Sequence, residues 1–433
     1  MNGLELYKKA KGIIPGGVQL LSKRPEMFAP EVWPAYYSRA KGSRVWDLDG
    51  VEYTDISIMG IGAVILGYAD DDVDNAVIAA IRSGVASTLN CPEDVELAEL
   101  LLELHPWAGS VRYARSGGEA MSMAIRIARA ATKKDVVLFS GYHGWTDWYL
   151  AANLSADNAL DGHLMPGLQP NGVPRVLQGT TLPFRLDHLD SLRATIKGRE
   201  QEIGVIVIEP ARGEDAAREC LVELKAIAAE IGAVLIFDEI TSAFRMNPGG
   251  IHLRYGVEPD IAVFAKSMAN GYAISAVVGV EKVMQAAQTT FISSTNWTER
   301  VGPTAALATI KKYRANEVHK HIIAIGNAAK KVWSEKAAKH HLDVTISGLP
   351  TLANFRFESP LNQEMQTFFT IEMLKRGFLG FRQFKASFAH TAEDIERYAD
   401  AVDDVFGLIA RSPADTLLST PRAHSGFFRL TKE

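Results

Sequence analysis

Two charged residues that could act on one ligand, Asp238 and Lys266, each come at the end of a short apolar run. The runs, residues 233–237 and 261–264, are typical of buried parallel strands. In an open parallel sheet, ligands bind where the carboxyl ends of the strands meet. We therefore expect a carboxylate and an amine to face one pocket, although each charge alone is more simply explained as a solvated surface group.

A glycine-rich helix entry, Ser116-Gly117-Gly118, could bind a phosphate. It follows a strand predicted over residues 111–114 and precedes a helix predicted over residues 119–131. Backbone N–H groups and the helix dipole hold phosphates at such entries, and glycine allows a close approach. On its own, this motif is more often an ordinary helix cap.

Two further predicted strands end in groups that could contact a ligand. Tyr142 and His143 follow the strand over residues 136–140, so the aromatic ring could stack on a flat heteroaromatic molecule. Glu209 ends the strand over residues 205–209 and adds a carboxylate to the same edge of the sheet. Taken singly, surface packing explains the tyrosine, and a structural imidazole explains the histidine.

One cofactor, pyridoxal phosphate (PLP), needs all of these groups. It requires a phosphate site, a stacking face, an acid at its ring nitrogen and a lysine that forms a Schiff base. The glycine-rich entry, Tyr142, Asp238 and Lys266 supply these in turn. Asp238 would stabilise the charge of the pyridine ring, and the nearby cation with partial desolvation would make Lys266 nucleophilic. The residues therefore predict a PLP enzyme.

Strands and helices alternate through the middle of the chain, which indicates an α/β domain with a mostly parallel sheet. Strands are predicted over residues 111–114, 136–140, 205–209, 234–238, 261–265 and 276–280. Helices are predicted over residues 71–83, 95–104, 119–131, 221–231 and 281–287. A hairpin is predicted at Asp49-Gly50, between two alternating runs.

The character of the chain changes near residue 315, and three regions are expected. Residues 1–60 form an N-terminal segment and hairpin that packs with the smaller domain. Residues 61–315 form the large PLP-binding α/β domain, and residues 316–433 form a C-terminal α+β domain.

Composition favours a small-molecule ligand. The 433 residues carry 46 Lys and Arg against 51 Asp and Glu, so neither nucleic acid nor a membrane is expected as a partner. Two cysteines, Cys91 and Cys220, and histidines without zinc-like spacing indicate no metal site. We find no export signal and no membrane span, and expect a cytoplasmic protein.

An aromatic cluster follows the stacking motif and has two interpretations. Its members are Trp145, Trp148 and Tyr149. Packing in the core and lining of a substrate pocket both remain open for these side chains.

Taken together, the motifs resemble class III PLP-dependent aminotransferases, and most closely the glutamate-1-semialdehyde aminomutase branch. The matching stretches are RSGGEAMSMAIRIAR, YHG, IEP, FDEITSAFR and SFAHTAEDIERYADAV, and the likeness covers nearly the whole chain. It implies fold type I, with a mostly parallel seven-stranded sheet and a smaller C-terminal domain. It also implies a homodimer with active sites at the subunit interface, where a threonine of the partner subunit, Thr295, binds the phosphate. Ile240 would pack on the ring face opposite Tyr142.

Departures from the family pattern fall at the pocket. The usual Ser-Gly-Thr-Glu-Ala is Ser-Gly-Gly-Glu-Ala here, so Gly118 offers a backbone donor without a hydroxyl. Near the N-terminus, GGVQLLSKRP leaves two basic residues in place of the arginine that meets the substrate carboxylate in the aminomutase. After Thr295 come bulky and charged groups. The candidate substrate-binding residues are Lys23, Arg24, Trp297, Glu299 and Arg300.

These features predict an aminotransferase in which Lys266 is the general base. The amino acid donor, glutamate in most of the family, would pass its amine to the aldehyde or ketone of a small polar, sugar- or cyclitol-derived intermediate. Two alternatives stay open: an aminomutase that moves an amine within one substrate, and a noncatalytic nucleotide- or ligand-binding α/β protein. The chain has neither GxGxxG after a strand nor GxxxxGK[ST], and it retains Lys266, which argues against the second alternative.

Overall fold

The chain forms two compact units. The computed structural model describes residues 1–156, 158–161, 163, 166–211, 217–412 and 417–426. One unit joins Met1–Asp70 to Lys320–Glu433, and the other is Asp71–His319. The domain limits predicted near residues 60 and 315 stay a prediction.

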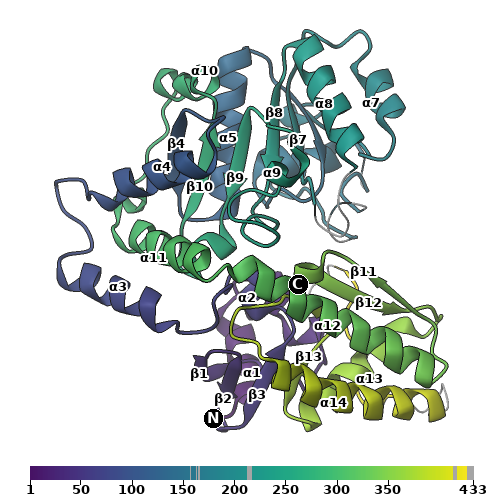
Figure 1. Ribbon diagram of the computed structural model, residues 1–433. Coiled ribbons are helices and arrows are strands. Elements are labelled where there is room, and N and C mark those ends of the chain that lie inside the picture. Colours follow the sequence, from purple (N-terminus) through teal and green to yellow (C-terminus); the bar gives the residue numbers. More distant parts are fainter. Residues whose placement is uncertain (157, 162, 164–165, 212–216, 413–416, 427–433) are drawn as a thin grey trace. The chain divides into compact units, whose positions relative to one another are not determined.

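A seven-stranded sheet organises the unit of residues 71–319 and confirms the predicted fold class (Figure 1). Its order is β4-β10-β9-β8-β7-β5-β6. The strands are β4 (Ser110–Ala114), β5 (Val136–Ser140), β6 (Thr181–Pro183), β7 (Ile203–Ile208), β8 (Val234–Asp238), β9 (Ile261–Phe264) and β10 (Ser275–Gly279). Neighbouring strands are parallel except that β10 runs antiparallel to both β4 and β9. The carboxyl ends of all strands but β10 therefore meet at one edge.

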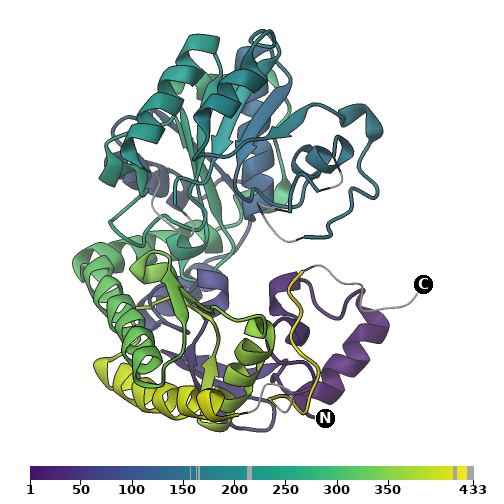
Figure 2. The ribbon, with the colours of Figure 1, turned by 90° about the vertical axis from the view of Figure 1, so that its right-hand side faces the viewer.

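Helices cover both faces of this sheet (Figures 1 and 2). Val137 of β5 faces the core that includes α5 (Gly117–Thr132). Its neighbour Leu138 faces the opposite core, which includes α7 (Leu189–Ile196) and α8 (Arg218–Ile231). A strand buried on both faces is apolar at every position, so the central strands show continuous runs and no alternation.

The other helices of this unit are α3 (Asp71–Arg82), α4 (Glu93–Leu104), α6 (Asp147–Leu150), α9 (His252–Tyr255), α10 (Glu281–Met284) and α11 (Val301–Ala315). Helix α11 packs on α3 and α4. Strand β6 and helix α7 lie outside the predicted elements. The strand has three residues and ends at Pro183, too short for a periodic pattern.

Two small sheets belong to the other unit. The first has the order β1-β2-β3-β13 and the second β11-β12-β14. The strands are β1 (Tyr37–Lys41), β2 (Arg44–Asp47), β3 (Glu52–Ile56), β11 (Val344–Ser347), β12 (Ala353–Phe357), β13 (Phe378–Gly380) and β14 (Gln383–Phe384). The predicted hairpin joins β2 to β3, and Gly50 at its tip has a φ of 82°, which glycine adopts without strain. Strand β3 also pairs in parallel with β13, so segments from both ends of the chain share one sheet.

The α-helices described in this unit are α1 (Gly3–Ile13), α2 (Met59–Gly62), α12 (Val318–Lys339), which begins two residues before the unit's boundary, α13 (Asn362–Lys375) and α14 (Ala392–Arg411). Helix α14 begins with a capping box in which Thr391 and Asp394 satisfy each other's backbone N–H groups. Throughout the described residues, every helix is too short or too polar to cross a membrane.

Candidate active site

Asp238 is the last residue of β8, and it is only 3% exposed. Its Oδ2 accepts a hydrogen bond from Nδ1 of His143 at 2.8 Å. Its Oδ1 accepts one from the backbone N–H of Ile240 at 3.1 Å. The other ring nitrogen of His143, Nε2, lies 3.2 Å from the carbonyl oxygen of Ser140. Hydrogen bonds on both oxygens give the buried carboxylate one fixed orientation.

Lys266 begins the short helix η5 (Lys266–Ala269), just beyond β9. Its Nζ donates a hydrogen bond to Oγ1 of Thr241 at 2.8 Å. The backbone φ of Lys266 is 50°, in the left-handed region that non-glycine residues rarely adopt. Sequence reasoning missed Thr241, although its place in the same loop as Asp238 and Ile240 was an available signal.

The segment Ser116-Gly117-Gly118, here called the phosphate cradle, begins α5 through a capping box. The backbone N–H of Glu119 donates to the Ser116 hydroxyl at 3.4 Å, and the backbone N–H of Ser116 donates to the Glu119 carboxylate at 2.9 Å. The serine hydroxyl is thus engaged in the cap. The first N–H groups of a helix have no partner inside it, so those of Gly117 and Gly118 are the groups suited to an anion.

Two loops pack directly against the phosphate cradle. A Cβ on Gly117 would lie 3.0 Å from Cδ1 of Ile240, in the loop after β8. A Cβ on Gly144, in the loop after β5, would lie 3.2 Å from Cα of Gly118. Side chains at these glycines would displace their neighbours, so the three segments meet only because the glycines are bare. The acid, the lysine and the cradle therefore belong to one site.

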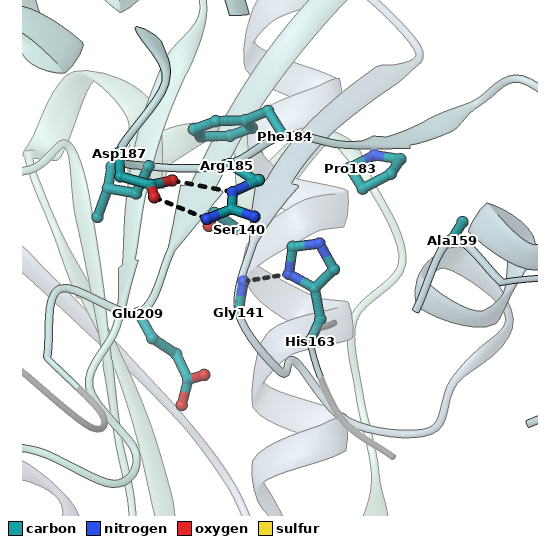
Figure 3. A pocket seen from close by; sticks show the side chains of 10 residues that line it. Ser140, Gly141, Ala159, His163, Pro183, Phe184, Arg185, Asp187 and Glu209 are labelled. Carbon is teal, nitrogen blue, oxygen red and sulfur yellow. Dashed lines mark hydrogen bonds and ion pairs between the residues drawn. The ribbon is translucent and has the colours of Figure 1, made fainter. Parts of the chain in front are cut away.

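The stacking candidate Tyr142 is fixed through its backbone, whose N–H donates to Oε2 of Glu209 at 2.8 Å. Beside this contact lies a pocket of about 640 Å³, here called the side pocket (Figure 3). Glu209, His163 and Phe184 line it, and Nδ1 of His163 accepts the backbone N–H of Gly141 at 3.1 Å. Arg185 also lines it, paired with the neighbouring carboxylate of Asp187 at 2.7 Å (Figure 3). The side pocket thus combines charged, hydrogen-bonding and apolar groups.

Two of the candidate substrate-binding residues have partners within the unit. Oε1 of Glu299 lies 3.0 Å from Nε of Arg115, and its carboxylate accepts the backbone N–H of Val301 at the start of α11. Arg300 donates three hydrogen bonds to Glu93 of α4, which lower the pKa of that carboxyl. These contacts anchor α11, and a role in substrate binding stays a prediction for both residues.

The other four predicted residues lie in the segment before α11 and in the other unit. Trp297 is half-buried and packs against the α5 core, and Thr295 is exposed at the start of η7 (Thr295–Thr298). Lys23 and Arg24 belong to the other unit, where Lys23 ends the short helix η1 (Leu21–Lys23). For these four residues a contact with cofactor or substrate stays a prediction.

The aromatic cluster divides into two roles. Trp148 and Tyr149 lie in the hydrophobic core on the α5 face of the sheet, which matches the packing interpretation. Trp145, in contrast, is 71% exposed and does not join the core.

Residues 27–387 match the class-III aminotransferase family. The chain belongs to this family. Among its curated relatives, the enzyme is 30% identical to the 3-aminobutyryl-CoA aminotransferase of Cloacimonas acidaminovorans, over 92% of this chain and 95% of that protein. It is 31% identical to the 2'-deamino-2'-hydroxyneamine transaminase of Streptomyces kanamyceticus, over 86% and 92%. It is also 31% identical to the glutamate-1-semialdehyde 2,1-aminomutase of Caldicellulosiruptor saccharolyticus, over 92% and 96%.

Solved structures agree with this assignment. A PLP form of the FumI protein of Sphingopyxis sp. MTA144 superimposes with a TM-score of 0.86 at 25% identity, covering 96% of this chain and 100% of that one. An omega-transaminase from Sphaerobacter thermophilus shares the fold, with a TM-score of 0.84 at 24% identity, covering 95% and 98%.

Membership of the family confirms the predicted cofactor and the enzyme interpretation: this is a PLP-dependent transaminase or aminomutase. The noncatalytic alternative is thereby disfavoured. The residues present fit PLP, because the phosphate cradle lacks the Cβ atoms that would fill it and because a buried carboxylate and a lysine share the same sheet edge. Across the described part of the chain, no cluster of His, Cys, Asp and Glu could hold a metal ion.

Proposed function

We propose that the enzyme transfers an amino group from an amino acid, glutamate, to the aldehyde or ketone of a small polar biosynthetic intermediate derived from a sugar or cyclitol. The observation that carries this proposal is the side pocket of about 640 Å³, which adjoins the Tyr142–Glu209 contact. Its carboxylate, imidazole and guanidinium groups beside Phe184 suit a hydroxylated molecule with some apolar surface.

In this proposal the backbone N–H groups of the phosphate cradle hold the phosphate of PLP. Asp238 holds the ring nitrogen, and Tyr142 and Ile240 cover the two faces of the ring. When bound, PLP withdraws electrons from the substrate carbon that carries the amine, which makes its proton acidic. Nζ of Lys266 would remove that proton as general base, and Thr241, which accepts a hydrogen bond from this amine, would orient it.

Two further residues act by holding these groups in place. His143 fixes the carboxylate of Asp238, and Glu209 fixes the backbone that carries Tyr142. Both therefore position the cofactor site without removing a proton themselves.

We also infer a cytoplasmic homodimer with shared active sites, in which Thr295 of the partner subunit binds the phosphate. The exposure of Thr295 in the single chain supports this inference. Cys91 and Cys220 are both free thiols, which fits a reducing compartment. Lys23, Arg24 and Trp297 are proposed to contact the substrate in the assembled dimer.

The relatives support two candidate reactions. The Streptomyces kanamyceticus relative is named for a hydroxylated amine, which favours a polar acceptor for this enzyme as well. Several other relatives are glutamate-1-semialdehyde aminomutases, which keeps the intramolecular reaction as the second candidate.

The source of the transferred nitrogen distinguishes the two reactions. We expect nitrogen-15 from labelled glutamate to appear in the product when the purified enzyme is given a panel of sugar- and cyclitol-derived aldehydes and ketones. The Lys266→Ala variant, which lacks the general base and the visible absorbance band of the bound cofactor, should transfer no label. Product that forms without any external donor, and without label, would show an aminomutase instead.

A further inference from the structure

We propose that the indole N–H of Trp145 replaces, in the phosphate cradle, the threonine hydroxyl that Gly118 lacks. Relatives with Ser-Gly-Thr-Glu-Ala are expected to offer a side-chain hydroxyl at this position, whereas this chain has a bare glycine. The inference rests on the proposed phosphate site at the start of α5, and it assigns that site one more donor.

The indole of Trp145 occupies the space in which a side chain at position 118 would lie. A Cβ on Gly118 would be 3.2 Å from Nε1 of Trp145 and 3.4 Å from its Cδ1. Both atoms belong to the edge of the five-membered ring that carries the N–H group. The glycine and the tryptophan therefore form a pair: a side chain at position 118 would push the indole edge away from its present place at the cradle.

Contacts on both sides of Trp145 hold it at this position. Gly144, with a φ of 105°, packs its backbone against Gly118 so closely that a Cβ there would lie 3.2 Å from Cα of Gly118. On the other side, the hydroxyl of Ser122 in α5 donates a hydrogen bond to Oγ1 of Thr146 at 2.9 Å. Because both flanking residues are attached to the first turns of α5, the backbone that carries the indole is fixed relative to the cradle.

The exposure of Trp145 leaves its side chain accessible to a ligand. The side chain is 71% exposed, whereas Trp148 and Tyr149 in the same segment are buried. An indole nitrogen can only donate, and within the described residues that of Trp145 has no acceptor. A donor beside the first N–H groups of a helix faces the place where an anion is favoured.

The chemistry of the indole edge suits a phosphate. The edge of an aromatic ring is electropositive, and the N–H group is its strongest donor. A hydrogen bond from this group to a phosphate oxygen is charge-assisted and therefore stronger than one between neutral groups. The tryptophan can thus restore the donor that the glycine removes.

The test compares the affinity of the apoenzyme for PLP with its affinity for pyridoxal, which lacks the phosphate. Binding of each is measured through the visible absorbance of the bound cofactor. Trp145→Phe keeps the ring and removes the N–H group. We expect it to raise the Kd for PLP about tenfold and to leave the Kd for pyridoxal unchanged. Trp148→Phe, which removes a buried indole N–H without a partner from the same segment, should change neither value.

A double variant tests the pairing directly. In Trp145→Ala combined with Gly118→Thr, the hydroxyl takes the vacated space, and the Kd for PLP should return to within about threefold of the original value. Trp145→Ala alone should bind PLP as weakly as Trp145→Phe.

Three results would overturn the inference. In the first, Trp145→Phe binds PLP unchanged; in the second, it weakens PLP and pyridoxal equally. In the third, it dissociates the dimer without altering the preference for PLP over pyridoxal, which would assign the indole to the subunit interface. The proposed phosphate site itself fails only if the unaltered enzyme binds PLP and pyridoxal equally well.

Discussion

The amine of Lys266 is oriented by Thr241, a residue of the loop after β8. The same loop carries Asp238 and Ile240. One short segment therefore positions the acid, a covering side chain and the partner of the lysine. A change in this loop would disturb all three groups, whereas a change at Oγ1 of Thr241 would disturb only the amine.

We expect Thr241→Val to lower kcat about tenfold, because the amine loses the hydrogen bond that orients it. Valine keeps the shape of threonine, so the melting temperature and the Kd for PLP should stay the same. Thr241→Ser retains the hydroxyl and should recover most of the rate. Steady-state kinetics of the three proteins check this prediction, and a serine variant as slow as the valine variant would contradict it.

The loop after β8 is connected to α4 through a histidine at the end of that helix. His105 donates from Nδ1 to the carbonyl oxygen of Leu101 at 2.7 Å and accepts the backbone N–H of Gly250 at Nε2, at 2.9 Å. Its ring also stacks on Phe264 of β9, with 4.8 Å between the ring centroids. The neutral ring thus connects a helix, a strand and a loop behind the active site.

This connection should weaken in acid. Burial, together with the nearby His252, lowers the pKa of His105 from 6.5 to about 4. The unfolded chain therefore takes up this proton first, so the stability is complete above pH 6.5 and is lost as the pH falls toward 4. By about pH 5 the loss amounts to about 2 kcal/mol.

The His105→Gln variant isolates this effect, because the amide can make both hydrogen bonds and carries no titratable group. Between neutral pH and about pH 5, the melting temperature of the unaltered enzyme should fall by about 2 °C more than that of the variant. Equal decreases for the two proteins would show that another group causes the acid loss.

Local sequence patterns predicted the central strands of the sheet well, but they missed its outermost strand, β6. The limits of β5 and β8 can be read from their apolar runs, because strands buried on both faces exclude polar residues. Strand β6 has no such run. In the site, the residues that end strands were predictable, since strand ends converge at one edge.

Contacts between segments that are distant in the chain could not be predicted from the sequence. Arg300 pairs with Glu93 across 207 residues, and no periodicity relates the two. Trp145 likewise lies against Gly118 because two loops fold together, and its exposure is visible only in three dimensions. The sequence therefore predicted which groups the chemistry needs better than which groups surround them.

The complete active site is expected to need two chains. Thr295 is exposed in the single chain, and so are two large apolar side chains of the same unit, Leu89 and Phe291, at 79% and 83%. Exposed apolar groups of this size favour a covering partner. A homodimer with shared sites would cover these apolar side chains and would place Thr295 at the active site of the partner subunit.

Mixing two defective variants tests whether the sites are shared. Lys266→Ala lacks the lysine, and Thr295→Ala is expected to bind PLP about tenfold more weakly. If Thr295 acts across the interface, a mixed dimer has one site with neither change. At PLP concentrations that leave Thr295→Ala mostly unloaded, the mixture should therefore bind more PLP and show more activity than the two proteins measured separately and added. Two proteins that refold together into dimers without this gain would show that Thr295 acts within its own chain.

The left-handed backbone of Lys266 has a consequence for the evolution of this chain. A φ of 50° at a lysine costs about 1 kcal/mol or more, whereas glycine or asparagine adopts it readily. The fold alone would therefore select against lysine at this position, and only the reaction retains it. In a descendant that had lost the reaction, drift at position 266 would lead toward glycine or asparagine and toward a more stable protein.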